Sequence, residues 1–178
     1  MQITKAHLTP NEYSRPQKPL LSTRAIVLHW VGNPSTSARA NRDFWESRKD
    51  GGNGYGSAHL IVDDREIIEA IPLFEMAYHV GAESYTPFAL EFLSSYPNNC
   101  TLGIEMTHPD WTGRPSEDTW QRTVRLVADL LLSQRLKAHN ITTHHAITGK
   151  DCPRWMVRHP AELERFRWDV DLHMREAA

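Results

Sequence analysis

The chain has 178 residues, 40% of them hydrophobic and 24% charged, as expected for one soluble globular domain that buries a core. Its formal net charge of −2 argues against a nucleic-acid partner, because binding phosphates requires a clustered basic excess. No apolar run approaches the ~20 residues of a membrane span and the polar start is unlike a signal peptide, so we expect a protein that is cytoplasmic as synthesised.

In its first half the chain alternates polar and apolar segments. A central strand is predicted where an apolar run, interrupted only by His29, ends at a Gly-Asn-Pro turn. A hairpin is predicted where two apolar runs are joined by Asp63 and Asp64. In chain order we expect an extended arm, the central strand, a helix and the two hairpin strands at residues 1–22, 24–31, 37–50, 57–62 and 66–71.

The second half begins with a proline-containing stretch, 76–99, that looks mostly irregular. Because this length is unusual for a loop without structure, the stretch is either a functional loop or contains short helices that the sequence pattern does not place. Its clearest helix starts at Ser116, with acidic residues in the first turn and apolar residues at helical spacing. The expected strand, helix, short strand and C-terminal helix lie at 101–107, 116–137, 141–144 and 160–178. Strands that alternate with helices predict a single α/β domain with a central mixed β-sheet flanked by helices.

Metal-ligating residue types gather in the segment 142–154, which Gly149 and Pro153 mark as a loop. His144 precedes Cys152 by eight residues, and an imidazole nitrogen and a thiolate are both donors that suit Zn²⁺. His29, near the end of the predicted central strand, is the natural third ligand. Two His and one Cys would leave one tetrahedral position open, as in catalytic zinc sites.

This ligand set has three alternatives. His29 alone could be a hydrogen-bonded core histidine. His145 could replace its neighbour His144, although adjacent residues on a strand face opposite ways. Cys100 and Cys152, the only two cysteines, could form a disulfide instead.

Two further residues have the character of catalytic groups. Glu105 is a single carboxylate in an apolar strand. Burial would raise its pKa toward neutrality, which suits a proton acceptor. Alternatively, it pairs with an Arg or with a histidine that binds the metal. Lys150 could stabilise negative charge on a carbonyl oxygen under attack, or be an exposed loop lysine. His59 and His79 are candidate substrate contacts, donors of a hydrogen bond to a metal ligand, or plain hydrogen-bonding residues.

Five short motifs resemble, in order, those of the zinc-dependent type-2 N-acetylmuramoyl-L-alanine amidases of phage endolysins and bacterial autolysins, which are related in fold to peptidoglycan-recognition proteins. They are IVLHW (26–30), SAHLIVDD (57–64), AYHVG (77–81), LGIEM (102–106) and HHAITGKDCP (144–153). The resemblance runs from about residue 24 to 154, and its Gly-Lys-Asp-Cys-Pro element with the upstream His is specific.

The resemblance implies that His29, His144 and Cys152 bind zinc, that Glu105 is the proton acceptor and that Lys150 stabilises the oxyanion. It implies hydrolysis of the amide between N-acetylmuramic acid and L-alanine in peptidoglycan, by a protein expected to be a monomer. A non-catalytic muropeptide-binding module of the same fold is the alternative, but such modules lack the Cys ligand. The protein would act on the cell wall after release, or as a cytosolic wall-recycling enzyme.

Overall fold

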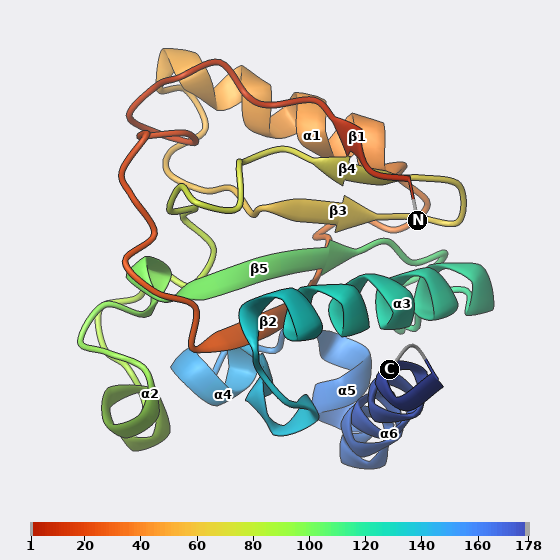
Figure 1. Cartoon of the computed structure of the whole chain (residues 1–178). Helices are drawn as coiled ribbons and strands as arrows, with labels where there is room; N and C mark the ends of the chain where they lie inside the picture. The colour runs from red at the N-terminus through yellow and green to blue at the C-terminus, as the bar shows by residue number, and fades with distance from the viewer. Residues whose placement is uncertain (1, 177–178) are drawn as a thin grey trace.

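A six-stranded mixed sheet, in the order β1-β4-β3-β5-β2-β6, forms the centre of the protein (Figure 1). The computed structural model describes residues 2–176. The strands are β1 (Thr4–Lys5), β2 (Ala25–Trp30), β3 (Leu60–Val62), β4 (Ile67–Glu69), β5 (Thr101–Met106) and β6 (Ile141–Thr143). β3, β5, β2 and β6 run parallel to one another, whereas β4 is antiparallel to β3, so the predicted hairpin and the α/β class with a mixed sheet are confirmed.

The helices connect these strands and cover both faces of the sheet. They are α1 (Ala38–Glu46), α2 (Pro87–Phe92), α3 (Glu117–Gln134), α4 (His144–Thr148), α5 (Arg154–Arg158) and α6 (Pro160–Glu176). Short 3-10 turns occupy η1 (Ser47–Asp50), η2 (Pro97–Asn99) and η3 (Ala138–Asn140). Ser116, the predicted start signal of the long helix, caps α3 by accepting a hydrogen bond from the backbone N–H of Thr119.

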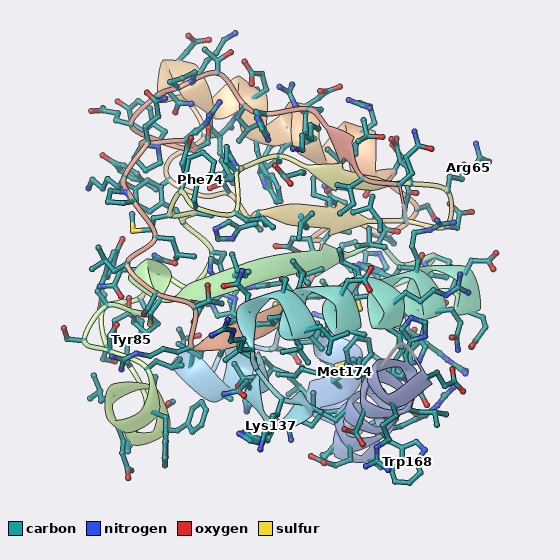
Figure 2. All side chains as sticks on the ribbon, viewed as in Figure 1. Arg65, Phe74, Tyr85, Lys137, Trp168 and Met174 are labelled. Carbon is teal, nitrogen blue, oxygen red and sulfur yellow. The ribbon has the colours of Figure 1, made fainter. Side chains whose placement is uncertain are left out.

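Alternation along the strands assigns side chains to the two faces of the sheet. Ile26 and Leu28 of β2 pack with Leu102 and Ile104 of β5 against α3 and α6, in the main core cluster. Phe166 of α6 is fully buried in the same cluster. Trp168 on α6 is 66% exposed and points away from the body of the protein (Figure 2), so this helix buries a narrower stripe than its apolar residues suggest.

The opposite face is covered only in part. α1 packs near the far edge over β3 and β4, while α4 packs over β2 and β6 (Figure 1). Val27 and Ile61 point to this face and are fully buried beneath these elements. The uncovered strip between the two helices lies over β5 and β2, where the next residues on the same face are His29 and Glu105.

The structure adds detail to two local predictions and corrects a third. The N-terminal arm is extended as predicted, and it also contributes β1, which pairs in parallel with β4. The stretch 76–99 contains α2 and η2, in agreement with the alternative that it holds short helices. The strand predicted at 141–144 ends at Thr143, and His144 starts helix α4 in what was expected to be a loop.

At the C-terminus the predicted helix is confirmed to Glu176, and residues 177–178 lie outside the described range. Within that range, none of the helices combines the length and apolarity needed to cross a membrane.

Candidate active site

A cavity of about 740 Å³ opens on the uncovered strip of the sheet. Six residues singled out from the sequence line it together. They are His29, His79, Glu105, His144, Lys150 and Cys152. The site predicted from separate motifs is therefore assembled in one place.

Strand register explains how three of these residues meet. His29 of β2 is paired directly with Glu105 of the parallel strand β5, so both side chains leave the same face of the sheet. On the other side of β2, Thr143 of β6 is paired with Leu28, and the chain then turns into α4. His144 therefore stands beside the end of β2, at the carboxyl edge of the parallel strands, where α/β sheets place their sites.

A tight turn after α4 returns Cys152 to the same point. Gly149 ends the helix with a φ of +82°, a conformation that suits glycine. The backbone N–H of His145 then donates to the carbonyl of Cys152 at 2.8 Å. This bond holds the cysteine against the first turn of α4.

The ligand atoms of His29, His144 and Cys152 all lie within 4.8 Å of one another, and the three residues are 1%, 6% and 3% exposed. His29 Nδ1 is 3.6 Å from Cys152 Sγ. This triad can hold a metal ion.

Two of the three alternatives to this ligand set, the one at His145 and the disulfide, are not realised. His145 is exposed, and its Nδ1 lies 3.0 Å from the carbonyl oxygen of Lys150. Cys100 and Cys152 are both free thiols, so no disulfide competes for the sulfur.

The electrostatics of the site favour a cation. Burial raises the pKa of Glu105 from 4.5 to about 8, and the Lys150 ammonium offsets this rise in part. Burial, with the nearby Glu105 carboxylate, also raises the pKa of the Cys152 thiol. Glu105 Oε2 is buried without a hydrogen-bond partner among the described residues. A divalent cation would stabilise the anionic forms of both groups, so the residues fit a bound metal.

Lys150 is exposed at the wall of the cavity, unlike the three buried residues of the triad. Its positive charge lowers the pKa of Glu105 and, after the larger effect of burial, the pKa of His144. The ammonium therefore influences the charge state of groups within the site.

The two histidines considered as substrate contacts occupy different environments. His79 lines the cavity but is only 7% exposed, and its Nδ1 lies 2.9 Å from His29 Nε2. His59 is fully buried, lies outside the lining and bonds to the backbone of Gly103 and Glu75. The structure thus places His59 in the protein interior, directly before β3.

Most of the remaining cavity wall was not anticipated from the sequence. Aromatic and polar side chains from α1 and from several loops contribute to it. They include Asn41, Phe44, Arg48, Tyr55, Tyr78, Tyr96 and Asn98. The six tryptophans were the only signal for an aromatic wall, and their number does not say which residues contribute to it.

Comparisons with known proteins agree with the geometry. Residues 19–155 match the family model described as N-acetylmuramoyl-L-alanine amidase. A probable N-acetylmuramoyl-L-alanine amidase of Bacillus licheniformis is 35% identical over 161 residues, which are 90% of this chain and 45% of that protein. N-acetylmuramoyl-L-alanine amidase CwlL of the same organism is 31% identical over 177 residues, 96% of this chain and 47% of that protein. The chain thus spans about half the length of these relatives.

Solved structures share the fold at lower sequence identity. The solution structure of the PlyG catalytic domain has a TM-score of 0.76 at 22% identity, over 98% of this chain and 96% of that one. A mutant endolysin from Bacillus subtilis has a TM-score of 0.74 at 20% identity, over 95% and 98% of the two chains. The resemblance inferred from the motifs is confirmed, and the chain belongs to the N-acetylmuramoyl-L-alanine amidase family.

Proposed function

We propose that this protein is a zinc-dependent hydrolase that cleaves the amide bond between N-acetylmuramic acid and L-alanine in bacterial peptidoglycan. Family membership and the names of the relatives support the reaction. The observation that carries the proposal is the convergence of His29, His144 and Cys152 beside the unpartnered carboxylate oxygen of Glu105.

The triad would hold Zn²⁺ through two imidazole nitrogens and one thiolate, with a fourth position left for reactants. When bound, zinc supplies Lewis-acid chemistry that polarises the amide carbonyl and acidifies water. The burial of all three ligands keeps competing solvent away and holds their atoms in place.

Glu105 would act as the proton carrier of the reaction. Its carboxylate faces the cavity from β5, next to His29 in register, and one of its oxygens has no hydrogen-bond partner within residues 2–176. It would accept a proton from the attacking water and pass it to the nitrogen of L-alanine as the amide breaks. Lys150 would stabilise the negative charge that develops on the carbonyl oxygen.

The place of action is also a proposal. Solved structures of the same fold include endolysins, which supports action on the cell wall after release from the cell that makes the protein. A cytosolic role in wall recycling is the alternative. The expected monomeric state stays a prediction.

Purified cell walls provide the test. Incubation with the zinc-loaded protein should release new amino-terminal L-alanine without new sugar reducing ends. Removal of zinc with a chelator should abolish the release, and resupplied zinc should restore it. Full hydrolysis by the zinc-free protein would contradict the mechanism, whereas wall binding without new amino termini would favour a muropeptide-binding module.

A further inference from the structure

The geometry points to His79 as a positioning residue that fixes the ring of the metal ligand His29, rather than as a residue that binds substrate. The inference rests on the ligand set of the proposed function. It assigns to His79 the task of accepting a hydrogen bond from His29 Nε2, so that His29 Nδ1 carries the lone pair for the metal.

The proton positions follow from the groups at the far end of the His79 ring. Its Nε2 lies 3.2 Å from the carbonyl oxygen of Thr101, which can only accept, so Nε2 carries the hydrogen. A ring that is 7% exposed is expected to be uncharged, which leaves Nδ1 as an acceptor. His29 Nε2, at 2.9 Å from that atom, must then be the donor.

His29 is therefore left with its lone pair on Nδ1. That atom is 3.6 Å from Cys152 Sγ, on the side of the triad, whereas Nε2 faces away from it toward His79. A metal ligand whose second nitrogen donates a hydrogen bond is held in one tautomer and one ring orientation, and it becomes more basic.

The surroundings hold the His79 ring in this orientation. Asn98 Oδ1 accepts hydrogen bonds from the backbone N–H groups of His79 and Val80, at 3.1 and 2.9 Å. The ring itself lies on β5 at Gly103, where an added Cβ would stand 2.6 Å from Cγ and Nδ1 of His79. Gly103 is thus required by the close approach of the ring.

A role as a substrate contact would need a free polar atom, and His79 has none. Nδ1 forms a hydrogen bond with His29. Nε2 lies near two oxygens of Thr101, the backbone carbonyl and, at 3.1 Å, the side-chain hydroxyl. The ring contributes to the cavity lining only through its small exposed part.

Two isosteric substitutions separate the hydrogen bond from the packing. His79→Asn places an amide oxygen near the position of Nδ1, where it can accept a hydrogen bond from His29. The leucine of His79→Leu has nearly the same shape as this asparagine but no acceptor. We expect His79→Leu to weaken zinc binding about 10- to 100-fold in chelator competition. His79→Asn should retain most of the wild-type affinity.

A spectroscopic measurement on the unaltered protein tests the same point. In the zinc-free protein, ¹⁵N NMR of the imidazole rings should show His29 with its hydrogen on Nε2. A hydrogen on Nδ1 would overturn the inference. A role in packing alone would not determine this tautomer.

A glycine pair covers the case in which His79→Leu fails to fold. Gly103→Ala should displace the ring and weaken zinc binding, whereas Gly52→Ala, where an added Cβ meets nothing within 4 Å, should not. Equal zinc affinities for His79→Asn and His79→Leu, or for Gly103→Ala and Gly52→Ala, would overturn this inference alone. A wild-type protein without zinc affinity would overturn the proposed metal site and this inference together.

Discussion

Buried histidines should make the protein sensitive to mild acid, and His59 allows the effect to be measured for a single group. His59 is fully buried, and burial lowers its pKa from 6.5 to about 4, against a smaller opposing effect of Glu75. As the pH falls below 6.5, the unfolded chain binds a proton that the folded protein excludes. The stability that depends on the neutral ring is therefore complete above pH 6.5 and is lost progressively down to about pH 4.

The magnitude follows from the difference between the two pKa values. Each pKa unit corresponds to about 1.4 kcal/mol, so His59 should account for a loss of about 3 kcal/mol between pH 6.5 and 4. In the zinc-free protein, burial also lowers the pKa values of His29, His79 and His144. The contribution of His59 must therefore be measured as a difference between two proteins.

The assay is urea unfolding of zinc-free wild type and His59→Asn across this pH range. The Asn side chain keeps an oxygen that can accept the backbone N–H of Gly103, as Nδ1 does at 3.0 Å in the wild type. The wild type should lose about 3 kcal/mol more than the variant on acidification. His139→Asn, at an exposed histidine, should follow the wild type. Parallel stability curves for wild type and His59→Asn would refute the reasoning.

Three other substitutions give separate tests. Glu105→Gln should keep zinc but lose about 10²- to 10⁴-fold in kcat on muropeptides, because it removes the proton acceptor; unchanged turnover would exclude this role. Cys152→Ser should lower the zinc content measured after gel filtration, and a full complement of metal would show that the sulfur is not a ligand. Ser116→Ala should lower the free energy of unfolding by about 1 kcal/mol in urea, since it removes the cap that accepts the N–H of Thr119; an unchanged midpoint would argue against that cap.

The elements that the sequence predicts well are those with a long or regular apolar pattern. The run at 24–31 identified β2 as a buried central strand, and helical spacing after Ser116 identified α3. β1 has only two residues and depends on pairing with β4, so no local sequence pattern predicts it. α4 is only five residues long and is followed directly by Gly149, so the segment resembled a loop.

The grouping of His29, His144, Cys152 and Glu105 was predictable because short motifs carry all four residues, three of them in or directly after a strand. The roles of His59 and His79 were not, because they depend on which face of the sheet each ring occupies and on what it meets there. The His79 ring lies within hydrogen-bonding distance of the His29 ring. The nitrogens of the His59 ring bond to backbone groups, and that ring contacts the edge of His79. Side chains of the cavity wall such as Tyr55 and Tyr96 come from loops whose paths depend on the completed fold.

The position of the triad in the chain has a consequence for the lifetime of the protein. His29 and Cys152 are 123 residues apart in the sequence, so a cation held by both joins an early strand to a late turn. Binding of this kind stabilises only the folded state, and molecules deprived of the ion would open more often and expose their backbone to proteases. Zinc supply would then govern how many molecules survive as well as how fast each one works.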